Sequence, residues 1–75
     1  MKACIRLTPS MVQDFVNVTS KCNFDIDIAG YHRYSVDAKS IVGILGLDMS
    51  KPLTVTYYGY NEELESFLAR HALAS

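Results

Sequence analysis

The sequence predicts an α+β fold, a two-layer open-faced β-sandwich in which helices cover one face of a four-stranded antiparallel sheet. Four short stretches alternate apolar and polar residues, which is typical of half-buried strands. Three other segments start with a helix-capping residue and continue with apolar residues at helical spacing. The order is β-α-β-β-α-β-α. A right-handed crossover in the first β-α-β unit then leaves a gap in the sheet for the last strand.

The first strand and helix are predicted at the N-terminal end of the chain. Residues 2–7 alternate between apolar and polar side chains, which favours a strand. Thr8 and Pro9 predict a helix start, because threonine is a good N-cap and proline suits the first helical position. We expect the helix to end near Cys22-Asn23, since asparagine tolerates the left-handed C-cap conformation. Its apolar face comprises Met11, Val12, Phe15, Val16 and Thr19.

A β-hairpin follows the first helix. Residues 24–28 alternate cleanly, so we expect a strand with Asp25 and Asp27 facing water. Residues 29–33 supply the turn, and residues 34–37 return as the second arm.

A short helix and the last strand come next. Ser40 or a near neighbour is expected to cap the helix, which residues 48–52 interrupt because Pro52 cannot donate a helical hydrogen bond. Residues 53–58 alternate again and predict the fourth strand.

The last helix is predicted from a cap and a charge pattern. Asn61 can cap it, and Glu62 and Glu63 lie in its first turn, where the helix dipole favours anions. The face directed at the core is expected to comprise Leu64, Phe67, Leu68, His71 and Ala72.

Composition indicates one globular domain over residues 1–75, with a net charge of −1 and cations scattered along the chain. This balance argues against nucleic-acid binding, which needs a basic field. No apolar run approaches a membrane span, and the first residues do not have the pattern of a signal peptide. Cys4 and Cys22 are therefore expected to be reduced thiols in a cytoplasmic protein.

Catalytic and metal-binding patterns are weak. His32 lies in the predicted hairpin turn and His71 near the end of the last helix, and neither has partners at metal-ligand spacing. The cysteines do not form a Cys-x-x-Cys motif. We therefore expect no metal, no cofactor and no enzymatic activity.

Several motifs resemble the HPr family, the histidine-containing phosphocarrier proteins of the bacterial sugar phosphotransferase system. The most specific is residues 37–47, DAKSIVGILGL, which is similar to the family's lysine-serine-isoleucine-x-glycine segment at the start of its second helix. Further similarity lies in Thr19-Ser20-Lys21, residues 24–27, residues 53–56 and Asn61-Glu62-Glu63. The resemblance covers nearly the whole chain and implies the HPr-like form of the predicted fold.

The phosphocarrier histidine of that family is missing. The family carries it in a Gly-x-His-Ala-Arg-Pro segment between the first strand and the first helix, whereas Leu7 here runs directly into Thr8-Pro9-Ser10. Thr8 stands roughly where the histidine would be. A threonine has no nitrogen nucleophile that titrates near neutrality, so histidine phosphotransfer is not expected. A phosphocarrier that uses a displaced nucleophile, His32, is the alternative.

Ser40 is the candidate regulatory site. In the Gram-positive branch of the HPr family, the matching serine is phosphorylated by a dedicated kinase. The resemblance thus implies the HPr serine kinase and phosphotransferase-system or regulatory proteins as partners. A phosphate at a helix N-terminus meets free amides and the positive end of the dipole. The alternative is that Ser40 only caps the helix.

Residues 38–49 carry more apolar side chains than one buried stripe needs. In the HPr family the exposed apolar side of this helix docks onto partner proteins, so the resemblance implies a patch of Val42, Leu45 and Met49 here. The candidate docking set also includes Lys39 and Ile41. A helix sunk deeply in the core is the alternative, and such a patch would also permit weak self-association. A structural module that keeps only the fold remains a third hypothesis.

Overall fold

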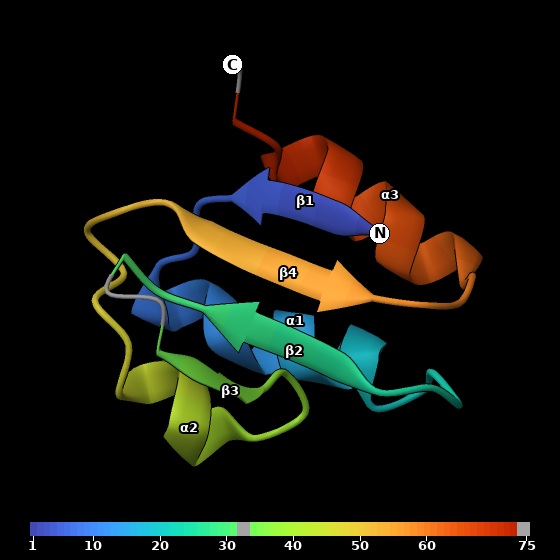
Figure 1. Cartoon of the computed structure of the whole chain (residues 1–75), viewed down its shortest axis with the longest axis horizontal. Helices are drawn as coiled ribbons and strands as arrows, with labels where there is room; N and C mark the ends of the chain where they lie inside the picture. The colour runs from blue at the N-terminus through green and yellow to red at the C-terminus, as the bar shows by residue number, and fades with distance from the viewer. Residues whose placement is uncertain (32–33, 74–75) are drawn as a thin grey trace.

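The computed structural model describes residues 1–31 and 34–73 (Figure 1). Within these residues it contains one four-stranded antiparallel sheet and three α-helices, which confirms the predicted α+β class. Part of the predicted hairpin turn, including His32, lies outside the described residues. In chain order the elements are β1 Lys2–Ile5, the 3₁₀ helix η1 Pro9–Met11, α1 Val12–Thr19, β2 Ile26–Ala29, β3 Ser35–Asp37, α2 Ile41–Leu45, β4 Leu53–Tyr57 and α3 Glu62–His71.

The last strand fills the gap that the crossover was expected to leave. The strand order is β1-β4-β2-β3, so β4 pairs with both β1 and β2. Val55 marks the register, since it lies opposite Ala3 on one side and Ile28 on the other. Val36 of β3 lies opposite Ile28 and continues this row. One apolar row therefore runs across all four strands.

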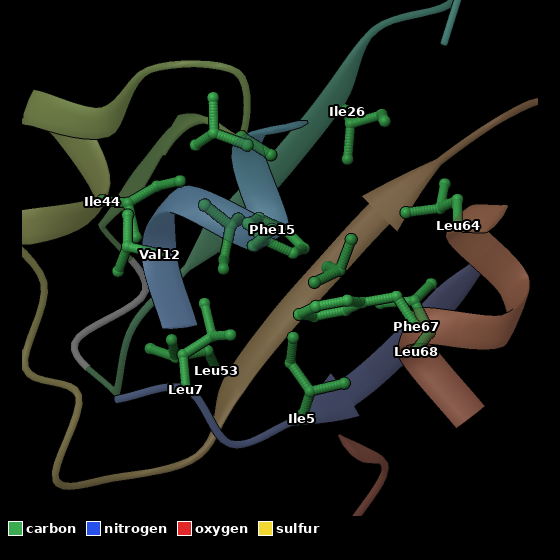
Figure 2. Packing of buried hydrophobic residues seen from close by; sticks show 14 of the residues in the cluster. Ile5, Leu7, Val12, Phe15, Ile26, Ile44, Leu53, Leu64, Phe67 and Leu68 are labelled. Atoms are coloured by element: carbon green, nitrogen blue, oxygen red, sulfur yellow. The ribbon is translucent and has the colours of Figure 1, made fainter. Parts of the chain in front are cut away.

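The core lies between one face of the sheet and the helices. Leu53, Val55 and Tyr57 alternate along β4 and are buried, whereas the threonines between them are only partly covered. Figure 1 shows α1 behind the sheet, and Figure 2 shows Phe15 of α1 and Phe67 of α3 in the same apolar cluster. The two aromatic rings lie 5.4 Å apart. Among the described residues, no helix covers the opposite face of the sheet, as the open-faced sandwich requires.

Several predicted boundaries were wrong by a few residues. The helix after Pro9 begins as η1, and the Thr8 side chain does not cap it; its hydroxyl instead lies 3.0 Å from that of Ser10. The helix α1 ends at Thr19 rather than near Cys22-Asn23, because the amides of Lys21 and Cys22 bond to carbonyls three residues back in tighter turns.

The strands are also shorter than predicted, and α3 stops sooner. The first strand ends at Ile5, β2 is shifted to 26–29, and β4 ends at Tyr57. Ala72 is extended and exposed rather than part of the apolar face of α3. There it pairs with Ile5 at the outer edge of β1, since the amide of Leu73 donates to the Cys4 carbonyl at 3.0 Å. Pairing with the edge strand β1 therefore takes Ala72 out of the helix that its apolar spacing had predicted.

Among the described residues, no helix has the length and apolar character that crossing a membrane would require.

Candidate functional site

Ser40 is the N-cap of α2. Its backbone is extended, with φ −105° and ψ 110°, and its Oγ accepts a hydrogen bond of 3.1 Å from the amide of Gly43. The predicted cap is thus confirmed. This bond satisfies one of the amides that a helix start leaves without a partner.

Gly43 allows α2 to lie close to the hairpin. A Cβ built at this position would be 3.2 Å from Cβ of Val36 and 3.3 Å from the Ser40 hydroxyl oxygen. Both distances are tighter than ordinary side-chain contacts. The glycine therefore serves packing between α2 and β3 as well as capping, which the sequence alone did not indicate.

The apolar residues of the segment 38–49 divide between core and surface. Ala38, Ile44 and Leu47 are buried, and Ile41 and Met49 are partly buried against the core. Val42 is 84% exposed and Leu45 is 50% exposed. We call this exposed pair, Val42 and Leu45, the α2 surface.

The remaining candidate, Lys39, is engaged within the molecule. Its ammonium donates to the Cys22 carbonyl at 3.0 Å, and its amide donates to a carboxylate oxygen of Asp37 at 2.9 Å. Lys39 thus links the turn after α1, which contains Cys22, to the loop before α2.

Thr19 fixes the same junction from inside the core. This buried side chain donates to the Ala38 carbonyl at 2.8 Å, and the Val16 carbonyl lies 3.2 Å away. A buried carbonyl without a donor costs free energy, so this contact holds the loop that carries Lys39 and Ser40.

The two cysteines are free and lie in different environments. Cys4 is exposed, whereas Cys22 is buried with its thiol 3.6 Å from the Val18 carbonyl. Burial raises the pKa of the Cys22 thiol, and the nearby Lys39 charge opposes this shift. A thiol held in its neutral form is a poor nucleophile.

Thr8 is exposed, and its hydroxyl contacts that of Ser10. His71 packs at the edge of the core, with its ring centroid 4.5 Å from that of Phe67. Within residues 1–31 and 34–73, no three side chains of histidine, cysteine, aspartate or glutamate are grouped so that they could hold a metal ion.

One polar feature was not anticipated from sequence, namely the alignment of Asp27 with Asp37. The register places these aspartates directly opposite each other on β2 and β3. Strand alternation predicted that Asp27 faces water, but only the pairing register brings the second carboxylate beside it.

Comparison with protein-family models finds no family that matches this chain, and no curated protein sequence matches it.

Proposed function

We propose that this protein is a non-catalytic, HPr-like partner-binding module that docks through the α2 surface and is regulated at Ser40. The observation that carries the proposal is the exposure of Val42 and Leu45 on a helix whose other apolar residues are at least partly buried. A short helix that presents apolar side chains to solvent gains by covering them with a partner.

The strand arrangement supports the HPr-like assignment. The resemblance rests on the order β-α-β-β-α-β-α, and β4 lies between β1 and β2 as the predicted crossover requires. The position of Ser40, the serine of the lysine-serine-isoleucine-x-glycine motif, as the N-cap of α2 also supports the proposal.

The absence of a phosphocarrier histidine supports a non-catalytic role. Thr8 has no group that could accept and release a labile phosphoryl group, and neither Arg6 nor Ser10 supplies one. The Ser40 hydroxyl is only partly covered, so a kinase that displaces the Gly43 hydrogen bond could reach it. Phosphorylation would place a dianion directly beside the exposed α2 residues and change what they bind.

The first test is the intact mass of the full chain after incubation with ATP and bacterial HPr serine kinase. We expect one added phosphate on the parent chain and none on Ser40→Ala. The matched control is Ser50→Ala, which removes another exposed serine and is expected to be phosphorylated like the parent. No added mass on the parent would refute regulation at Ser40 by this kinase.

Docking is tested by the rate of the same reaction. Val42→Ser should slow phosphorylation by reducing affinity for the kinase, whereas Ala69→Ser, on the exposed side of α3, should not. In a separate incubation with the first enzyme of the phosphotransferase system, an acid-labile, alkali-stable phosphoryl group that His32→Ala abolishes would favour the phosphocarrier alternative instead. Equal rates of phosphorylation for Val42→Ser and Ala69→Ser would show that the α2 surface is not the docking site.

A further inference from the structure

The open face of the sheet has an uncharged centre. Cys4, Thr54, Ala29 and Ser35 follow one another across β1, β4, β2 and β3 in a single row. Their side chains are small and none is charged. A shallow hollow of about 480 Å³ lies over this part of the face, lined by Lys2, Ala29, Gly30, Thr54 and Thr56.

Charge on the same face is segregated by strand. The next row is Lys2, Thr56, Asp27 and Asp37, again in the order β1, β4, β2, β3. The basic group lies on one edge strand, and just beyond that strand comes Arg6. The two carboxylates lie on β2 and on β3, the opposite edge strand. Opposed like charges destabilise a strand pair, and no described lysine or arginine forms a salt bridge with either aspartate.

The next row along the strands also carries a carboxylate on the β2 side of the open face. Ile26 pairs with Tyr57, so Asp25 and Tyr58 come next along this ladder, and Gly59 then lies against the ring of Phe24. Ile26 and Tyr57 are buried, so alternation directs Asp25 and Tyr58 to the open face. Tyr58 is 84% exposed.

We propose that the occupant of the open face is a second copy of this chain, related by a two-fold axis parallel to the strands. This rotation places β1 over β3 of the second copy and β4 over its β2. Lys2 then faces Asp37 of the second copy, Thr56 faces its Asp27, and Tyr58 faces its Asp25. The same contacts repeat on the other side of the axis, as an isologous interface requires. Asp37 thereby gains a cation that no described lysine or arginine of its own chain supplies through a salt bridge.

The area of the open face indicates the size class to which this dimer interface belongs. Four strands about 4.8 Å apart, each about four residues long, give a flat surface of roughly 250 Å² per copy. A standard stable interface buries about 800 Å² per partner, so this dimer belongs to the weak, transient class. The helix α2 lies on the other side of the sheet, against Val36, and the α2 surface stays accessible. The dimer is therefore independent of the proposed function.

Sedimentation of the full chain over a range of concentrations tests the proposal. We expect the average mass to rise with concentration and to fall with added salt. Lys2→Asp or Asp37→Lys alone should weaken association by about two- to thirtyfold, because two symmetric ion pairs are lost per dimer. The double variant Lys2→Asp/Asp37→Lys should restore it. The matched control, Asp14→Lys on α1, changes the net charge as Asp37→Lys does and should leave association unchanged.

A covalent cross-link tests the orientation. The rotation places Cys4 over Ser35 of the second copy, so Ser35→Cys should form an intermolecular disulfide with Cys4 when glutathione disulfide is added as oxidant. The control variant Gln13→Cys, on α1, should form far less intermolecular disulfide under the same conditions. Circular dichroism verifies that each variant is folded. The proposal would be overturned if the chain stayed monomeric at all concentrations. It would also be overturned if the double variant associated no more strongly than the single variants. Association that Val42→Ser abolishes would overturn it as well, because the dimer would then form through the α2 surface.

Discussion

Gly59 offers a sharp test of how the turn after β4 is packed. A Cβ at this position would lie 2.5 Å from Cδ2 and 2.6 Å from Cγ of the Phe24 ring. The backbone of Gly59 is outside the left-handed region, so Gly59→Ala meets a shortage of space and no backbone strain. The Phe24 ring is itself stacked on Tyr57, with centroids 6.0 Å apart, and cannot move without disturbing that contact.

The expected magnitude follows from two opposing effects. Carbon atoms pack best about 3.5–4.0 Å apart, so the ring must move by roughly 1 Å or more. Overpacking of this kind costs about 1–3 kcal/mol, while replacing glycine by alanine favours folding by about 0.4–1 kcal/mol through the unfolded chain. The net loss in the free energy of unfolding is then about 1.5 kcal/mol. In a domain of this size that lowers Tm by roughly 6–12 °C.

Urea and thermal unfolding, followed by far-UV circular dichroism, measure this loss. Gly46→Ala is the matched control, because its Cβ would meet the carbonyl oxygens of Gly43 and Val42 at 3.4 and 3.9 Å, which are ordinary contacts. We expect the control to be as stable as the parent or slightly more so. In a Phe24→Leu background, Gly59→Ala should cost less, because the ring that it strikes has gone. Equal stability of Gly59→Ala and Gly46→Ala would refute the argument.

Three further predictions concern the cap, the buried hydroxyl and the tyrosine. Ser40→Ala should lower the free energy of unfolding by about 1 kcal/mol in urea titrations, whereas Ser40→Asp, which keeps a capping oxygen, should not. Thr19→Val should cost about 1–3 kcal/mol because the Ala38 carbonyl loses its donor, and Thr19→Ser should retain that bond; equal losses for both would contradict this account. Burial and the 2.6 Å hydrogen bond to Glu65 raise the pKa of Tyr57 to about 12, so this group favours the folded state below pH 10, and its contribution is lost as the pH rises from 10 to about 12. Glu65→Gln should bring the Tyr57 transition in tyrosinate absorbance to lower pH, and an unchanged transition would assign the shift to burial alone.

The local features of this fold were predictable from sequence. Ser40 and Asn61 cap their helices by accepting from amides three residues further on, at 3.1 and 3.0 Å. Both bonds depend only on neighbouring residues. The alternation along β4 likewise predicted which side chains enter the core, because successive residues of a strand point to opposite faces. The ends of the elements were less predictable, since Ala72 left its helix to pair with Ile5.

The candidate site was predicted only in part. The motif indicated Ser40 and a set of apolar neighbours, but its pattern could not separate core from surface. Lys39 appeared available for a partner, yet its ammonium is bonded to the Cys22 carbonyl across the loop. The exposure of a side chain depends on which other elements reach it, and segments distant in sequence decide this.

The sequence by itself therefore determined the types of the elements, their order and the caps at Ser40 and Asn61, because each depends on periodicity or on a hydrogen bond between near neighbours. Only the tertiary structure decided that Val42 and Leu45 are exposed while Ile44 and Leu47 are buried. It also placed Asp27 opposite Asp37 and left Lys2 at the far edge of the same row. Strand register and the packing of α2 on β3 join residues that are far apart in the chain, so no local pattern contains them.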